Sequence, residues 1–167
     1  MATNILFSSL PNEAFPISTG PGDIFTGGAV AFQPPGNCGV IGVSLLLRGY
    51  TAAIGEQVRV ELYGNQAFGN QNRPANCLGS LKVPPGNDDG SVAVFTCLLG
   101  EPVSLTGGQI YWLLVYGGFI EGPPPAYIAL SWLVGNSNPA VVQVAQFVVG
   151  NYEASALVPA FEVLVAA

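Results

Sequence analysis

Apolar and polar residues alternate along much of this chain, and they do not recur at helical spacing. In the segment QVRVELY, residues 57–63, the apolar Val58, Val60 and Leu62 share one side, and the residues between them share the other. A period of two is typical of a β-strand with one buried face and one solvent-facing face. The pattern therefore predicts a strand here, with Arg59 and Glu61 together on its wet side.

Similar short runs recur along the whole chain, separated by clusters of Gly, Pro and Asn. Gly and Pro number 22 and 14, which is typical of many short elements joined by tight turns. The predicted strands are residues 4–8, 29–33, 39–48, 57–63, 77–83, 91–98, 109–117, 126–134, 141–149 and 159–166. About ten short strands at this spacing predict an all-β fold, a two-sheet antiparallel β-sandwich of jelly-roll-like type.

Two segments predict particular places in this sandwich. The run IYWLLVY, residues 110–116, is apolar on both faces, which indicates a central strand covered on both sides. The run GNQNRPAN, residues 69–76, is rich in turn-forming residues and predicts a longer loop at the rim of the sandwich.

The chain reads as a single domain, with an N-terminal arm and first strand over residues 1–28 and the β-sandwich over residues 29–167. The arm either adds a strand to the sheet edge of a neighbouring copy or pairs within its own sheet. The N-terminus lacks the basic and apolar regions of a signal peptide, and no run reaches the length of a membrane span. We therefore expect no membrane span and no export by the general secretory route.

Charged residues are scarce. They make up 8% of the chain, against about 25% in ordinary soluble domains, while half of the residues are hydrophobic. Either Asn, Gln, Ser and Thr solvate the surface, or much of the surface is buried against other copies of the chain. The net charge is −6 with only four basic residues, so nucleic acid is excluded as a partner and anionic membrane surfaces are disfavoured.

The three cysteines offer a candidate crosslink. A hairpin centred on Asn87 would place Cys77 and Cys97 directly opposite each other, close enough for a disulfide. The alternative is two neighbouring buried thiols. A disulfide would indicate an oxidising compartment and leave Cys38 either bonded to another subunit or buried as a free thiol. Zinc is not expected, because the cysteines are scattered and histidine is absent.

Catalytic groups are few. Without histidine there is neither a serine triad nor a histidine acid or base, which leaves a carboxylate pair such as Glu61 and Glu162. Trp112 and Trp132 fall in strongly apolar strands, which favours core packing over a ligand groove. The prediction is a non-enzymatic protein without a cofactor.

A weak calcium candidate lies at Asp88 and Asp89, in the run Asn-Asp-Asp-Gly. The same residues are what a tight hairpin turn requires. Metal binding is therefore not part of the leading interpretation.

Five segments, taken in order, resemble the bacterial choice-of-anchor R type of exported β-sandwich domain. They are AVAFQPP, VIGVSLLLRGY, EQVRVELYGN, SLTGGQIYWLLV and FEVLVA, and together they span nearly the whole chain. The resemblance implies a jelly-roll-like sandwich on an exported or surface protein, and it brings no catalytic residues. The chain departs from that family because it shows no signal peptide and no C-terminal anchor.

These observations predict a self-assembling structural subunit on the outside of a particle or filament: a virion surface or decoration protein, or a subunit of a surface appendage. Its partners would be other copies of itself, with a capsid or surface scaffold as a further partner. The expected location is the surface of a virion, cell or spore. The alternative is a carbohydrate-binding jelly-roll module with tyrosines stacked on sugar rings, the candidates being Tyr50, Tyr63, Tyr127 and Tyr152.

Overall fold

The chain forms β-strands joined by turns. The computed structural model describes residues 3–10, 24–25, 27–48, 58–86, 91–117, 119–120, 126–127, 132–133, 135–148, 151–154 and 158–167, and these residues contain no helix. The strands are β1 (Thr3–Ser8), β2 (Ile24–Phe25), β3 (Gly27–Phe32), β4 (Cys38–Arg48), β5 (Arg59–Phe68), β6 (Gln71–Lys82), β7 (Val92–Leu105), β8 (Tyr111–Tyr116), β9 (Phe119–Ile120), β10 (Ala126–Tyr127), β11 (Trp132–Leu133), β12 (Val141–Val148), β13 (Asn151–Ala154) and β14 (Phe161–Ala166).

Hydrogen bonding joins most of these strands into one continuous antiparallel sheet. Its order is β1-β14-β4-β7-β6-β5-β8-β3-β12-β13, with β2 and β11 attached beside β4 and a separate small hairpin formed by β9 and β10. The predicted all-β antiparallel fold is confirmed. The predicted division into two separate sheets is not confirmed, because the strand pairing runs unbroken through β7, β6 and β5.

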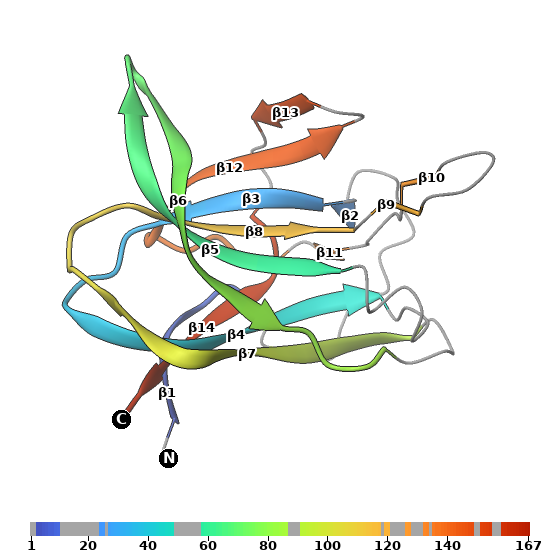
Figure 1. The fold of residues 1–167 in the computed structure, drawn as a ribbon, viewed down its shortest axis with the longest axis horizontal. Coiled ribbons are helices and arrows are strands. Elements are labelled where there is room, and N and C mark those ends of the chain that lie inside the picture. Colours follow the sequence, from blue (N-terminus) through green and yellow to red (C-terminus); the bar gives the residue numbers. More distant parts are fainter. Residues whose placement is uncertain are drawn as a thin grey trace.

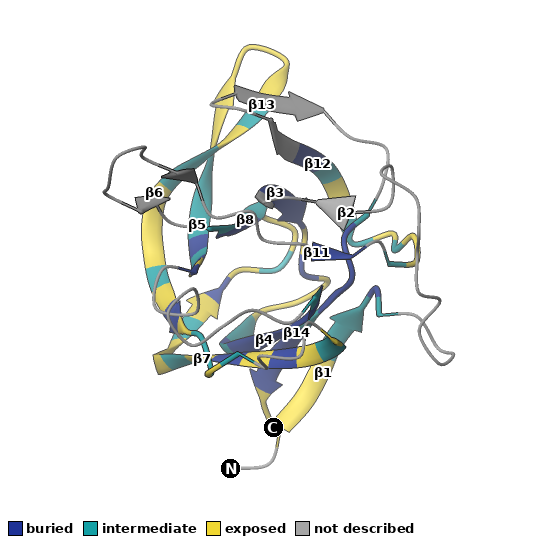
Figure 2. Ribbon diagram, turned by 90° about the vertical axis from the view of Figure 1, so that its right-hand side faces the viewer, coloured by how far each residue is buried: buried dark blue, intermediate teal, exposed yellow. Residues whose placement is uncertain are grey.

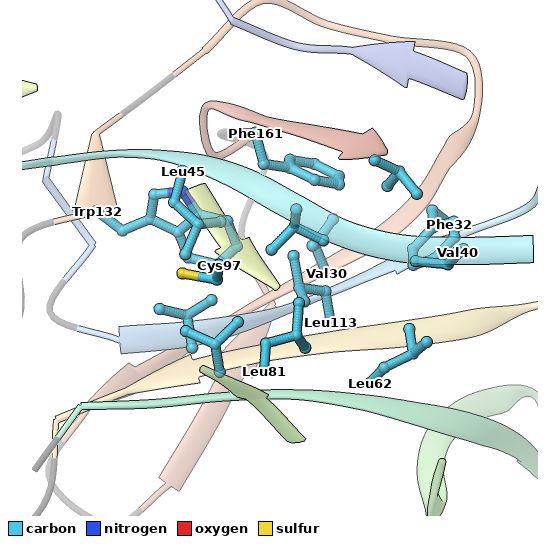
Figure 3. Packing of buried hydrophobic residues seen from close by; sticks show 14 of the residues in the cluster. Val30, Phe32, Val40, Leu45, Leu62, Leu81, Cys97, Leu113, Trp132 and Phe161 are labelled. Carbon is cyan, nitrogen blue, oxygen red and sulfur yellow. The ribbon is translucent and has the colours of Figure 1, made fainter. Parts of the chain in front are cut away.

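The sheet curls around its own hydrophobic core as a half-barrel (Figure 1). Strands β4, β7 and β14 line one side of the core, and β3, β8 and β5 line the other. Aromatic rings join the two sides: Phe7 on β1 lies 5.5 Å from Phe32 on β3 and 5.4 Å from Phe161 on β14. Curling therefore buries one face of β3, β4, β5, β7 and β14 within a single sheet, as the alternation predicts (Figure 3).

Strand β8 occupies the central position that its apolar run predicts. It pairs with β5 on one side and β3 on the other, and its four middle residues are buried. Leu113 and Val115 face the main core, whereas Trp112 and Leu114 belong to a second cluster with Ala residues of β3 and β12. Both faces of this strand are therefore covered.

The two terminal strands of the described chain lie side by side. Strand β1 pairs antiparallel with β14, from Thr3 opposite Ala166 to Ser8 opposite Glu162. Residues 3–8 of the predicted arm therefore pair within their own sheet. Ser9 fixes the junction: its buried hydroxyl donates to the Pro159 carbonyl at 2.7 Å and accepts from the Phe161 N–H at 2.9 Å.

The loop predicted over residues 69–76 is not found. Strands β5 and β6 continue as a hairpin arm, defined as residues 63–76, which projects from the barrel and turns at Gly69–Asn70 (Figure 1). Gly69 adopts a left-handed φ of 59°, which suits glycine at a tight turn. Pro74 fits inside this strand because the arm lies beyond the body of the sheet, where a missing N–H costs little.

Candidate functional site

Polar side chains gather on the outer face of β5, β6 and β8, at the base of the hairpin arm. Glu61 on β5 is the centre: its Oε2 accepts hydrogen bonds from the Tyr63 hydroxyl at 3.1 Å and the Tyr116 hydroxyl at 2.9 Å. The alternation of QVRVELY produces this arrangement, because Val58, Val60 and Leu62 are buried and the intervening side chains face outward. That prediction is confirmed.

The Tyr63 side chain has two polar neighbours, the Glu61 carboxylate and the Cys77 thiol. Desolvation is the main cause that raises the pKa of Tyr63 to about 12, followed by its hydrogen bond to Glu61, the charge of Glu61 and the nearby thiol of Cys77. The Tyr63 hydroxyl therefore stays protonated at neutral pH and acts as a hydrogen-bond donor to the carboxylate.

A second hydrogen-bonded chain extends from this cluster into the arm. The Trp112 indole N–H donates to Asn65 Oδ1 at 2.9 Å, and Asn65 Nδ2 donates to Asn72 Oδ1 at 3.0 Å. Trp112 is buried, and so is Trp132, whose indole N–H donates to the Ala160 carbonyl at 2.9 Å. Both tryptophans therefore pack in the protein, as predicted, and neither is an exposed platform for a sugar.

A hollow of about 370 Å³ opens beside Glu61 where β5 begins and β6 ends. Apolar residues form part of its lining, and the polar part carries both signs of charge. Its lining residues are Val58, Arg59, Val60, Glu61, Ser80, Leu81, Lys82 and Val83. Two of the chain's four basic residues therefore lie at this one place.

The predicted carboxylate pair is not brought together. Glu162 lies on β14, opposite Ser8 and Ser44, whereas Glu61 lies on β5. Three strands, β4, β7 and β6, separate β14 from β5 in the sheet. At about 4.8 Å per strand, the two carboxylates are roughly 19 Å apart along a curling surface, too far for the two-carboxylate mechanism.

The predicted disulfide is also not found. Leu81 pairs with Leu99 across β6 and β7, whereas a hairpin centred on Asn87 would pair Leu81 with Ala93. This register places Cys77 opposite Tyr63 of β5 and Cys97 opposite Val43 of β4. All three thiols are free, so the prediction of a Cys77–Cys97 bridge is wrong for this structure.

The three thiols lie in different surroundings. Cys97 is fully buried in the main core, where desolvation raises its pKa to about 12. Cys38 is half-buried against the same core, and burial raises its pKa as well. Cys77 is exposed at the base of the arm. Of the two alternatives for Cys38, a bond to another subunit or a buried free thiol, the structure shows a free, half-buried thiol, and the most accessible of the three thiols is Cys77.

The remaining predicted site residues lie outside what the structure describes in full. Asp88, Asp89 and Tyr50 lie outside the described residues. Tyr127 belongs to β10 and Tyr152 to β13, but nothing is described of their side chains. Within the described ranges, no three His, Cys, Asp or Glu residues cluster in a way that suits a metal ion.

A different kind of surface covers the outer face of β1, β14, β4 and β7. The outer apolar row, defined as Ile5, Leu164, Gly42 and Leu98, runs across these four strands in register. Ile5 is 56% exposed and Leu98 is 50% exposed, whereas Leu164 between them is only 7% exposed and Gly42 is buried, with the Leu98 side chain leaning over it. The four strands carry only three charged residues, Arg48, Glu101 and Glu162. The described part of this face therefore carries little charge, and its exposed apolar side chains, Ile5 and Leu98, lie at the two ends of the row.

Sequence reasoning missed two partners at the site. Tyr116 reaches Glu61 only because β8 pairs with β5, and Lys82 reaches the hollow only because β6 pairs with β5 in the observed register. Strand neighbours that are far apart in the chain leave no local signal. The available hint was the alternation itself, which places Arg59, Glu61 and Tyr63 on one side.

Comparison with known proteins assigns no family to the chain. No protein-family model matches it, and neither a curated protein nor a solved structure matches it significantly. Among the described residues, no helix is long and apolar enough to cross a membrane.

Proposed function

We propose that the chain is a non-enzymatic structural subunit that assembles with copies of itself on the outside of a particle or filament. Such a particle would be a virion, with this chain as a surface or decoration protein, or a surface appendage. The outer apolar row carries this proposal. Its exposed apolar side chains, Ile5 and Leu98, stand on a surface with few charges, and exposed apolar groups recruit partners.

The shape of the outer face suits a self-contact. Strands β4 and β7 have 11 and 14 residues, and β1 and β14 have 6 each, so at about 4.8 Å between strands and about 3.3 Å per residue the four strands span roughly 500 Å². This is of the order of the ~800 Å² per partner in a standard interface. Val94, which is 42% exposed, extends the apolar area along β7 beyond Leu98. Because few charges must be desolvated, burial of this face costs little in electrostatic terms.

The edge of the sheet offers a second way for copies of the chain to assemble. Among the described strands β1 is terminal in the sheet order, and a terminal strand has backbone groups to which another chain can pair. The resemblance to exported β-sandwich domains supports an outside location. In this proposal the curled sheet acts as a jelly-roll-like sandwich, with β14, β4 and β7 as one layer and β5, β8, β3 and β12 as the other.

The test is the native mass over a range of concentrations, measured by light scattering and sedimentation velocity. We expect wild-type protein to form large species that resist dilution. The paired variant Ile5→Lys with Leu98→Lys should be monomeric, with an unchanged far-UV circular dichroism spectrum. Phe68→Lys is the matched control, since Phe68 is 63% exposed but lies at the tip of the arm, away from the outer apolar row.

Two outcomes would overturn this proposal. Wild-type protein that stays monomeric at millimolar concentration would exclude self-assembly. Assembly that survives both lysines but is lost in Phe68→Lys would move the contact to the arm.

The alternative function, a carbohydrate-binding module, has one observation in its favour. Of the four candidate tyrosines, Tyr63 is the one whose side chain the structure describes. It lies with Tyr116 and Glu61 beside the hollow. Aromatic rings next to a carboxylate are groups that a sugar site uses. A glycan array on purified protein, combined with a monomeric mass, would favour this alternative over self-assembly.

A further inference from the structure

Two opposite charges lie at the sides of the outer apolar row, Glu162 on β14 and Lys82 on β6. Glu162 faces outward, because its neighbours Phe161 and Val163 point into the main core. Lys82 is exposed and pairs directly with Leu98, the last member of the row. Among the residues that the structure describes, neither charge has an ion pair or a side-chain hydrogen bond.

The two charges are too far apart to pair within one copy. Glu162 pairs with Ser44 of β4, β4 pairs with β7, and Lys82 joins β7 at Leu98. Three strand spacings of about 4.8 Å therefore separate them, roughly 14 Å on the outside of a curling sheet. A charge that is buried in an interface requires a partner there. If this face packs on another copy, each of the two charges must consequently find its partner on that copy.

The other charges on these strands lie away from the centre of the face. Arg48 is the last residue of β4. Glu101 lies on β7 where the pairing with β4 shifts register, between Val40 and Gly42. On the described strands of this face, Glu162 is therefore the charge that a contact through the centre must neutralise.

The two charges select the symmetry of such a contact. A two-fold axis across the strands would set β14 over the partner's β14 and bring the two Glu162 carboxylates together. An axis along the strands, between β4 and β7, instead sets β14 over the partner's β6 and β6 over the partner's β14. Glu162 then lies a step of two residues, about 7 Å along the strand, from the position facing the partner's Lys82. The long side chains of both residues span this step, and the symmetry forms the pair twice.

We propose that two copies of the chain pack face to face across this axis, with Glu162 of each copy paired to the partner's Lys82. The proposal rests on the self-assembly proposed above and names the surface and the charge pair that carry it. Leu98 and Val94 on β7 supply exposed apolar area at the centre of the contact. With roughly 500 Å² from each copy, the contact covers about 1,000 Å² in total, the lower limit of a specific interface.

Charge reversal with rescue tests the proposal, measured on the full chain by sedimentation equilibrium at low ionic strength. Glu162→Lys and Lys82→Glu should each raise the dissociation constant at least about tenfold, because both copies of the pair become repulsive. The double variant Glu162→Lys with Lys82→Glu should return to within about threefold of the wild type. Weakening without rescue in the double variant would overturn the proposal.

A mixture of the two single variants provides a second test. Glu162→Lys has two basic groups at these positions and Lys82→Glu has two acidic groups. In a two-fold contact, mixed dimers therefore regain two attractive pairs, although neither variant associates well with itself. Native mass spectrometry should show mixed dimers in excess of either homodimer, and a failure to enrich them would contradict the pairing.

Glu101→Lys is the matched control, since it reverses an exposed carboxylate on β7 that the pair does not use. It should leave the dissociation constant within about twofold of the wild type, and a loss equal to that of Glu162→Lys would reduce the effect to net charge and overturn the proposal. Large species that persist in both single variants would overturn this contact and leave self-assembly intact. A monomeric wild type would overturn both proposals and leave the face to a different protein.

Discussion

Strands β5 and β6 each run through two regions, the barrel and the arm, which differ in how far their side chains are buried. In the barrel, Val60, Leu62 and Leu81 are buried in the main core. In the arm, the same two strands continue their backbone pairing, but Phe68 at the tip is 63% exposed and the surrounding residues are half-buried or exposed (Figure 2). Side-chain contacts there include the Asn65–Asn72 hydrogen bond and the Arg73 guanidinium 4.5 Å from the Phe68 ring centre.

The difference shows that strand pairing and burial are separate sources of stability. Isolated two-stranded hairpins are marginal in water, because each backbone hydrogen bond contributes little net free energy. The barrel adds apolar burial, at about 25 cal/mol per Å², to the same ladder. The arm should therefore open locally at much lower free energy than the barrel.

The largest expected contrast lies between Cys97, buried in the barrel, and Cys77, exposed at the base of the arm. Under native conditions a thiol reagent should modify the exposed Cys77 readily. It should modify the buried Cys97 at least about 10³-fold more slowly, because Cys97 reacts only after the core opens. Time-resolved mass spectrometry of alkylated peptides would measure both rates. Comparable rates would show that the core opens as easily as the arm.

Truncation of a core ring should affect global stability strongly. Phe161 is fully buried and its ring lies 5.4 Å from that of Phe7 and 6.0 Å from that of Trp132. We expect Phe161→Ala to lower the free energy of unfolding by about 3–5 kcal/mol, measured by urea denaturation. Phe68→Ala on the arm is the control and should change it by less than about 0.5 kcal/mol. Equal losses would contradict the contrast between the regions.

Alkaline pH should weaken the core through Cys97. Because its pKa is raised to about 12 in the folded state, the folded thiol keeps its proton at a pH where the unfolded thiol has lost it. The contribution is complete below about pH 8.5 and is lost as pH rises toward 12, on the order of 1–4 kcal/mol. Urea midpoints measured from pH 8 to 11 should fall less steeply in Cys97→Val. Parallel curves would argue against burial of the thiol.

Two glycines on β4 offer a matched test of close packing. A Cβ on Gly42 would lie 2.5 Å from the Cys97 carbonyl oxygen and 2.9 Å from Leu98 Cδ2, whereas a Cβ on Gly39 would meet no atom within 4 Å. We expect Gly42→Ala to cost about 1–3 kcal/mol and Gly39→Ala to be neutral or slightly stabilising. Thermal melts of both variants measure this difference. A neutral Gly42→Ala would show that β4 and β7 are less closely packed.

The smallest effect is expected in the arm itself. Asn72→Ala removes the hydrogen bond to Asn65 and should lower global stability by less than about 1 kcal/mol. Amide exchange should nevertheless speed up in residues 65–72 while the barrel amides stay unchanged. Faster exchange throughout the protein would mean that the arm and the barrel open together.

The sequence predicted most strands because alternation depends on neighbouring residues alone. The strands observed at Cys38–Arg48, Val141–Val148 and Phe161–Ala166 differ from the predicted ranges by at most two residues at either end. The β5–β6 arm was missed because its Asn, Gln and Pro residues are typical of loops. In the arm the two strands are joined by backbone hydrogen bonds, and the amino-acid composition gives no sign of that pairing.

Register was beyond sequence reasoning. The Cys77–Cys97 prediction assumed a symmetric hairpin, but β6 pairs over most of its length with β5 and meets β7 only near Leu81 and Lys82. The same limitation hid the pairing of Lys82 with Leu98, which sets a cation beside the outer apolar row. Contacts across strands depend on the global fold, whereas alternation does not.

The position of β14 between β1 and β4 has a consequence for synthesis on the ribosome. The sheet cannot join its first strand to the barrel until residues 161–166 have been made, because β1 pairs with β14. Until then the nascent chain leaves the β14-facing edge of β4 without its partner, and open strand edges favour intermolecular pairing. Release of incomplete chains should consequently be more hazardous for this protein than slow completion of full-length ones.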